Sequence, residues 1–131
     1  MHILQPPDWP RPKGYSHGVS ARGRQLFVAG QVGWEPLSQE FASDDFCDQA
    51  GRALANIRDI LAADGAAPHH VTRMTWFITS RDAYLADRRR LGAAYRAVMG
   101  DHYPAMTTVQ VAALLPPRAL VEIEALAVVP D

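Results

Sequence analysis

Hydrophobic and polar residues alternate regularly from Leu120 to Val129, and this period of two predicts a β-strand. Alternate residues of a strand point to opposite faces, so one face is apolar and consists of Val121, Ile123, Ala125, Ala127 and Val129. The opposite face consists of Leu120, Glu122, Glu124, Leu126 and Val128. Two carboxylates among Leu and Val side chains indicate that this second face meets solvent, or partner groups that need acids.

Similar apolar and β-branched runs predict four more strands, over Tyr15–Ser20, Gln25–Val32, Val71–Thr79 and Met106–Ala113. Residues 22–24 contain a glycine and form a turn between the first two strands, which predicts a hairpin. A second hairpin is predicted at the C-terminus, because residues 115–118 include two prolines that cannot donate a ladder hydrogen bond.

Two stretches repeat apolar residues at the spacing of an α-helix. The first follows Ser43, the predicted N-cap, and ends at Gly65; its apolar face consists of Phe46, Ala50, Ala53, Leu54, Ile57, Ile60 and Leu61. The second begins near Ser80 or Asp82 and ends at Gly100; its inner face consists of Tyr84, Leu85, Arg88, Leu91, Tyr95, Val98 and Met99. Because each helix is one-sided, both are expected to cover the same face of one sheet.

The predicted order is β-β-α-β-α-β-β, which indicates an α+β fold with a mixed β-sheet. Helices on one face leave the other face uncovered, and that face carries Glu122 and Glu124. Its Leu and Val side chains favour association of several copies of the chain. We expect a single domain over residues 1–131, with a proline-rich, extended N-terminal arm at residues 1–14.

Composition argues against several classes of function. Thirteen Lys and Arg residues against fourteen Asp and Glu residues give a formal net charge of −1, which disfavours a nucleic-acid partner or an anionic membrane. No apolar run approaches the ~20 residues of a membrane span, and the N-terminus lacks the order of a signal peptide. The lone cysteine, Cys47, excludes an internal disulfide. These features predict a soluble, cytoplasmic protein.

Four short motifs carry a resemblance to a known family: LFVAGQ at 26–31, NIRDILAADG at 56–65, YPA at 103–105 and VEIEA at 121–125. Together with the element order, they make the chain from about Gly14 to Pro130 resemble the Rid family, also called YjgF or endoribonuclease L-PSP-like. The resemblance implies a chorismate-mutase-like (ferredoxin-like) fold and a homotrimer with small-molecule clefts between subunits. It also implies hydrolysis of imines and enamines to ammonia and 2-keto acids, without a metal or organic cofactor.

The resemblance implies roles for several residues of the cleft. Glu122 matches the glutamate that positions the attacking water, and Tyr15 matches a tyrosine that lines the cleft. Gly30 matches a position whose backbone faces the ligand, and Thr108 matches a small polar residue. His17 lies two residues from Tyr15, on the same side of the predicted strand, and is a candidate acid–base group.

Two residues depart from the family pattern. Met106 follows Pro104-Ala105 where active deaminases of the family carry an arginine, and Gly92 stands where the archetype has an asparagine. A guanidinium grips a carboxylate with two parallel hydrogen bonds, whereas the Met106 thioether is only weakly polar. Deaminase activity is therefore in question, although the water-handling glutamate is present.

Three interpretations of Met106 are open. In the first, the protein hydrolyses imines that lack a carboxylate, or uses another arginine, for which the candidates are Arg118, Arg22 and Arg73. In the second, the cleft binds a small molecule without turnover. In the third, the cleft is vestigial and Met106 is ordinary packing.

Other charged residues have simpler interpretations. Glu124 is expected to pair with an arginine across a subunit interface, and the same is the alternative for Glu122. His69 and His70 are loop residues, because no second cluster of ligands accompanies them and a metal site needs one. Residues 88–90, three arginines, fan across a helix and are interpreted as a solvated face, although a ribonuclease function is the less favoured alternative that they raise.

Overall fold

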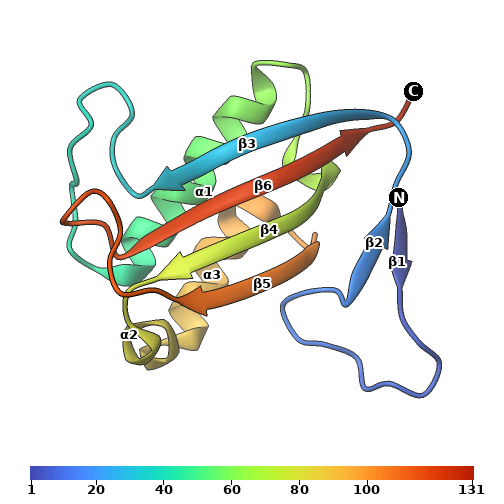
Figure 1. Cartoon of the computed structure of the whole chain (residues 1–131), viewed down its shortest axis with the longest axis horizontal. Helices are drawn as coiled ribbons and strands as arrows, with labels where there is room; N and C mark the ends of the chain where they lie inside the picture. Colours follow the sequence, from blue (N-terminus) through green and yellow to red (C-terminus); the bar gives the residue numbers. More distant parts are fainter.

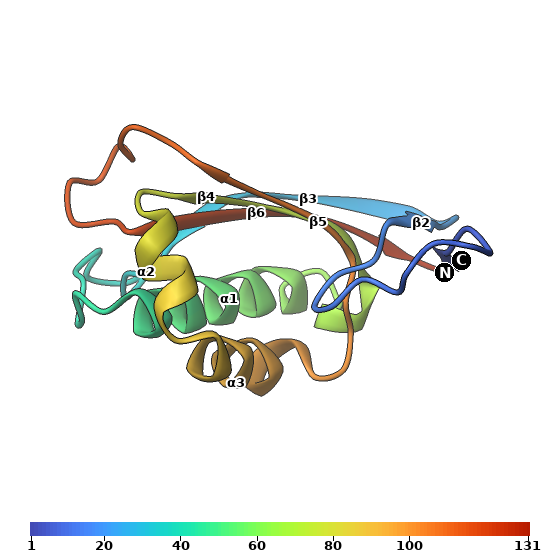
Figure 2. The ribbon, with the colours of Figure 1, turned by 90° about the horizontal axis from the view of Figure 1, so that it is seen from below.

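The computed structural model describes residues 1–131 and contains a four-stranded sheet with all its helices on one face (Figures 1 and 2). The strands follow the spatial order β3 (Arg24–Val32), β6 (Val121–Val129), β4 (Val71–Ile78) and β5 (Ala105–Gln110). β6 is antiparallel to both of its neighbours, and β4 is parallel to β5. The predicted α+β fold with a mixed sheet is therefore confirmed.

Neither predicted hairpin forms. β5 and β6 are separated by β4, because the apolar β6 takes a central place where its Val/Ile/Ala face is buried, while the more polar β5 lies at the edge. The strand before β3 is also different from the prediction. β2 (Gly18–Ser20) pairs with β1 (His2–Leu4), so the N-terminal arm includes a strand of a separate two-stranded sheet (Figure 1).

Three α-helices cover the sheet: α1 (Phe46–Ala62), α2 (Arg81–Ala86) and α3 (Arg88–Met99), with a 3-10 turn η1 (Pro68–His70) before β4. The N-cap of α1 is Asp45 and not Ser43, because the Asp45 side chain accepts the N–H of Asp48 at 2.9 Å. The predicted second helix is divided at Asp87, whose backbone is non-helical and whose carboxylate caps α3 by accepting the N–H of Arg90. None of the helices combines the length and apolar character that spanning a membrane requires.

The hydrophobic core lies between α1 and the sheet. Leu54, Ile57 and Leu61 of α1 are fully buried, as are Met74 of β4 and Ile123 of β6. The predicted apolar faces of α1 and β6 are thus the buried faces, except that Ile60 is 41% exposed and Val129 is only partly buried. Burying such side chains contributes about 1.5–3 kcal/mol each relative to leaving them in water.

The opposite face of the sheet is not covered by any element of the chain (Figure 2). Phe27 of β3 is 74% exposed there, and Val109 of β5 is 40% exposed. Glu124 is exposed on the same face, whereas Glu122 is partly buried. We call this the open face, and its mixture of apolar side chains and carboxylates is the one that the alternation of residues 120–129 predicts.

A bulge in β3 brings Gly30 against Glu122. The β3–β6 register shifts between Val28 and Gln31, so the strand bends at this point. A Cβ atom on Gly30 would lie 2.5 Å from Oε1 of Glu122 and 2.9 Å from its Cγ. Only a residue without a side chain fits between the β3 backbone and the Glu122 side chain.

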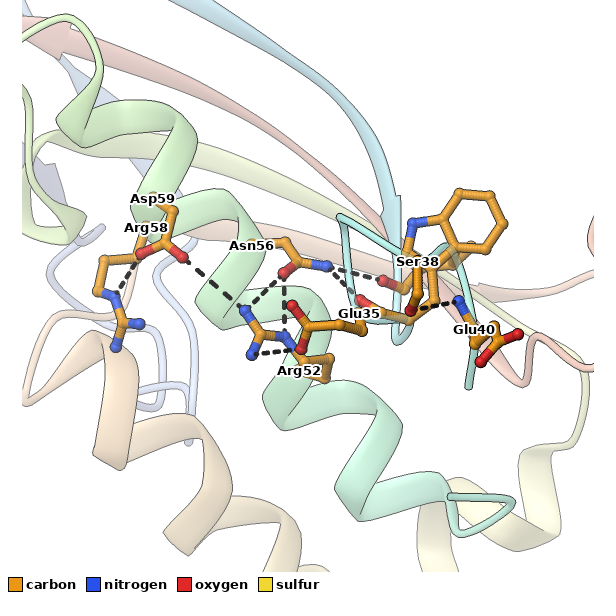
Figure 3. Close-up of polar contacts among 9 residues, drawn as sticks. Glu35, Ser38, Glu40, Arg52, Asn56, Arg58 and Asp59 are labelled. Atoms are coloured by element: carbon orange, nitrogen blue, oxygen red, sulfur yellow. Dashed lines mark hydrogen bonds and ion pairs between the residues drawn. The ribbon is translucent and has the colours of Figure 1, made fainter. Parts of the chain in front are cut away.

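A buried asparagine on α1 holds the end of β3 in place (Figure 3). Asn56 is 3% exposed, and its Nδ2 donates to the carbonyl oxygens of Val32 (3.3 Å) and Trp34 (3.0 Å). Its Oδ1 accepts two hydrogen bonds from Arg52, at 3.0 and 2.7 Å. Both polar atoms of the Asn56 amide therefore have hydrogen-bond partners, so the amide can be buried at low cost in free energy.

We expect Asn56→Ala to lower the free energy of unfolding by about 1–3 kcal/mol, because two backbone carbonyls and the Arg52 guanidinium lose their partner. The control is Asp59→Ala on the same helix, whose exposed carboxylate forms only surface ion pairs and whose loss costs below about 0.5 kcal/mol. Urea denaturation at one fixed protein concentration measures both. Equal effects of the two substitutions would contradict the role given to Asn56.

Gly30→Ala is expected to cost about 1–2 kcal/mol of folding free energy, because its Cβ meets the Glu122 side chain. In a Glu122→Ala background the obstructing atoms are absent, so the same change is expected to cost less by at least about 0.5 kcal/mol. A double-mutant cycle by urea denaturation gives this coupling. Strict additivity would show that Gly30 is required for another reason.

Candidate functional site

A cavity of about 490 Å³ lies on the helix side of the sheet, between α3 and the edge formed by β4 and β5. In addition to α3, the cavity is lined by residues 13–15, by Trp76 of β4, by Tyr84 of α2, and by Tyr103 with Met106 and Thr108 of β5. This volume falls within the range of small-molecule sites in proteins, about 300–1,000 Å³.

One stripe of α3 faces the cavity. The residues of this stripe occur at helical spacing and are Arg88, Leu91, Gly92, Tyr95 and Arg96. Residues three, four, seven and eight positions apart lie on the same side of a helix, so their side chains converge on one surface. The stripe is apolar in its middle and basic at both ends.

The alternation of the sheet places Met106 and Thr108 in the cavity. Met106 pairs with Met74 and Thr108 pairs with Trp76 in the parallel β4–β5 ladder. Met74 and Trp76 point toward the helices and are buried, so their partners on β5 point the same way. Trp76, Met106 and Thr108 accordingly line the cavity.

Tyr15 reaches the cavity because the next residue is attached to the start of β5. The N–H of Ser16 donates to the carbonyl of Pro104 at 3.0 Å, and its hydroxyl donates to the carbonyl of Tyr103. Tyr15 therefore stands beside the residues that follow Pro104. His17 does not line the cavity. Its ring packs edge-on against the rings of Tyr15 and Trp9, with centroids 5.7 and 5.1 Å apart.

Aromatic side chains form much of the cavity wall. Five of the lining residues are aromatic: Tyr15, Trp76, Tyr84, Tyr95 and Tyr103. Tyr95 and Tyr103 stack with ring centroids 5.4 Å apart. The Tyr95 hydroxyl donates to the carbonyl of His102 at 2.6 Å, and burial raises the pKa of Tyr95 far above its ordinary value, so this phenol stays neutral.

Gly30 and Glu122 lie on the other face of the sheet from this cavity. Glu122 belongs to the alternating set of β6 that faces away from the helices, and Gly30 contacts it from β3. The carboxylate of Glu122 accepts no hydrogen bond within the chain. Within one chain the predicted site residues thus form two groups, with Tyr15, Met106 and Thr108 in one group and Gly30 and Glu122 in the other.

None of the arginines proposed as substitutes for the family arginine lines the cavity. Arg118 donates two hydrogen bonds to Asp44, at 3.0 and 2.8 Å, and its guanidinium lies over the Phe41 ring. Arg73 is on the open face, where it contacts Thr107 at 3.4 Å and lines a shallow groove with Glu124. Arg22 is exposed.

The basic residues that do line the cavity are Lys13, Arg88 and Arg96, which sequence analysis does not assign to a site. Helical periodicity places Arg88 on the inner face of the predicted helix, but the run of three arginines at residues 88–90 is interpreted from the sequence as a solvated face. The spacing of Arg88, Gly92 and Arg96, with Leu91 and Tyr95 between them, is the signal that identifies the inward stripe.

Of the two adjacent histidines, His69 and His70, the second has a local structural role. The Nδ1 atom of His70 accepts the N–H of Ala67 at 3.0 Å, which fixes the 3-10 turn before β4. Burial lowers the pKa of His70, so its ring is neutral over a wider pH range than usual. No group of three or more His, Cys, Asp or Glu residues in the chain is arranged to hold a metal ion.

Comparisons with known proteins place the chain among relatives of the same fold. The sequence profile of the family described as Endoribonuclease L-PSP matches residues 10–129. The chain is 37% identical over 115 residues to the protein DfrA of Myxococcus xanthus, covering 87% of this chain and 84% of that protein. It is 32% identical over 114 residues to human 2-iminobutanoate/2-iminopropanoate deaminase, covering 87% of this chain and 79% of the human protein.

A solved structure supports the same assignment. The Rid-family protein YyfB of Yersinia pestis, a protein of unknown function, superimposes with a TM-score of 0.84 at 30% identity and covers 98% of both chains. Sequence profile, relatives and fold agree over nearly the whole length. The chain therefore belongs to the Rid (YjgF) family, the family of the Endoribonuclease L-PSP profile.

Proposed function

We propose that this protein is an imine or enamine hydrolase whose site is completed by a neighbouring copy of the chain in a homotrimer. The observation that carries the proposal is the division of the site residues between the two faces of the sheet. Tyr15, Met106 and Thr108 line one cavity, whereas Glu122 projects from the open face. A site that needs both groups requires the open face of one subunit beside the cavity of the next.

The open face supports this association on its own. Phe27 is 74% exposed and Val109 is 40% exposed there. Covering apolar side chains of this size with another subunit lowers the free energy of the assembly. A second copy of the same chain is the partner that family membership favours. The trimer is part of the proposal.

In the proposed reaction, Glu122 orients a water molecule and accepts one of its protons as the water oxygen bonds to the imine carbon. Water addition to the protonated imine gives a carbinolamine, and Glu122 passes the water proton to its nitrogen. The carbinolamine hydroxyl then gives its proton to Glu122 as the carbon–nitrogen bond breaks, so that ammonia leaves with a carbonyl product. Tyr15 donates its hydroxyl hydrogen to the ligand and orients it. All atoms are supplied by the imine and one water molecule, so the proposal includes no metal or organic cofactor.

The human relative is named as a deaminase of 2-iminobutanoate and 2-iminopropanoate, and this supports imines derived from amino acids as the substrate class. Met106 supports a second candidate function. Because a thioether does not hold a carboxylate as a guanidinium does, the same cavity is also suited to bind a small molecule without turnover.

The name of the family profile also raises ribonuclease activity, which the arrangement of residues 88–90 does not favour. Arg90 pairs with Asp45 at 2.8 Å and Asp48 at 2.7 Å, whereas Arg88 lines the cavity. The three guanidinium groups therefore do not form one surface for a phosphate backbone. We do not propose nucleic acid as a partner.

Glu122→Gln is expected to lower kcat/KM for imine hydrolysis by about 100-fold or more, because an amide cannot accept the proton of the attacking water. The matched control is Glu124→Gln on the same strand and face, which is expected to stay within about threefold of the natural protein. The assay uses freshly generated 2-iminopropanoate, with ammonia release as the readout, and light scattering shows whether each variant keeps its oligomeric state. Equal losses in both variants would contradict the role of Glu122.

Met106→Arg separates the hydrolase from the binding protein. If the natural protein hydrolyses 2-iminopropanoate, the new guanidinium is expected to lower KM by about tenfold with a smaller change in kcat, because it holds the carboxylate in both ground and transition states. A natural protein that is inert, together with a Met106→Arg variant that turns over, would instead support the non-catalytic candidate. Inactivity of both would remove the support for Glu122 as the water-handling group.

A further inference from the structure

Two arginines of α3 converge on the cavity from one face of the helix. Arg88 and Arg96 are eight residues apart and both line the cavity, with Gly92 midway between them. A Cβ atom on Gly92 would lie 3.0 Å from Nη1 of Arg96. The Arg96 guanidinium thus folds back along the helix, over the glycine and toward Arg88.

Glycine at position 92 lowers the stability of the helix but leaves room for the Arg96 guanidinium. Within a helix, glycine is less favourable than alanine by about 1 kcal/mol. A glycine at the middle of the cavity-facing stripe leaves the helix backbone uncovered, and the Arg96 guanidinium occupies the space that a side chain would take. The glycine thus allows this guanidinium position at the expense of some helix stability.

The charges of these arginines are not neutralised by acids of the same chain. Arg90 donates to Asp45 and Asp48, and the hydrogen bond from Arg90 lowers the pKa of Asp45. By contrast, Arg88 and Arg96 have no salt bridge, and Lys13, the third cation of the cavity, has none either. A concave surface with several unpaired cations attracts an anion.

The remainder of the cavity wall is suited to an apolar body. The apolar side chains of Leu91 and Met106 lie beside the five aromatic residues around the same space. The indole N–H of Trp76 is buried and has no acceptor in the chain. The cavity thus combines three cations, two of them on α3, with an aromatic and thioether wall to which several elements contribute.

We infer that this cavity selects a carboxylate with an aromatic or bulky apolar body, and that Arg88 and Arg96 hold the carboxylate in place of the arginine absent at position 106. The inference rests on the proposed function, since it concerns the same cavity. It assigns the anion-binding role to α3 instead of β5. Met106 then contacts the apolar part of the ligand.

The test measures equilibrium binding, which needs no turnover. Isothermal titration calorimetry with phenylpyruvate, a stable 2-oxo acid with an aromatic body, compares the natural protein with Arg88→Gln and Arg96→Gln. Each substitution is expected to weaken binding by about tenfold, which is the loss expected when one hydrogen bond to a charged group is removed. The matched control is Arg89→Gln, because Arg89 neighbours Arg88 on the helix but does not line the cavity, and it is expected to bind as the natural protein does.

The ligand supplies a second control. The neutral amide of phenylpyruvate keeps the aromatic body and loses the charge, so its binding is expected to be weaker in the natural protein and unaffected by Arg88→Gln or Arg96→Gln. Pyruvate, which has the carboxylate without the aromatic body, is expected to bind more weakly than phenylpyruvate. Phenylpyruvate that binds no better than its amide would overturn the inference.

Gly92→Ala tests the arrangement without removing a charge. The new methyl group is expected to displace the Arg96 guanidinium and weaken phenylpyruvate binding several-fold, while thermal stability rises because alanine favours the helix. A merely structural role of Gly92 would change stability and leave binding as it was. That result, together with unchanged binding in Arg96→Gln, would overturn the inference.

Two further outcomes separate this inference from the proposed function. Weakened binding in both arginine variants of a protein that hydrolyses no imine supports the inference and contradicts the hydrolase. Hydrolysis that is unaffected by Arg88→Gln and Arg96→Gln, with unchanged binding, contradicts the inference alone. Light scattering is recorded for each variant: loss of subunit association would show that these arginines hold carboxylates of a neighbouring copy, and would overturn the inference.

Discussion

The alternation of side chains across the sheet is the constraint on which the geometry of the candidate site depends. Successive residues of a strand point to opposite faces, and the β4–β5 register commits Met106 and Thr108 to the helix side. The same rule in β6 sends Glu122 to the open face. Because a shift of one residue would exchange the two faces and bury Glu124 in the core, the register is strongly determined. The proposed completion of the site by a second chain is based on this pairing.

The parts of the fold that the sequence predicts are those with a local signal. Helix α1 and strand β6 repeat their apolar residues at the proper period, and both bury the predicted face. The strand order was beyond prediction, because the pairing of Leu26 with Ala127 depends on free energies of contact between distant segments. For the site, family resemblance led to Tyr15, Met106 and Thr108, whereas it gave no indication of Arg96, whose cavity-facing position depends on where α3 begins.

Local pairing of charges explains how a nearly neutral chain contains a basic cavity. The acids that precede and begin α1 are engaged by arginines from elsewhere in the chain, Arg90 with Asp45 and Asp48, and Arg118 with Asp44. The formal charge of −1 is therefore a sum over distinct surfaces. Cations on the inner stripe of α3 are separated from these acids, and their field is concentrated in a concave, partly apolar space.

The central place of β6 has a consequence for how the chain reaches its native state. β6 is the last strand along the chain, yet it is the only bridge between β3 and the β4–β5 pair. Until it is synthesised, β3 has no partner in the main sheet and the inner face of α1 has an incomplete surface to pack on. Such long-range closure slows folding and leaves strand edges open to other chains. A nascent chain that stops before Val121 therefore leaves the edge of β3 and part of the inner face of α1 exposed.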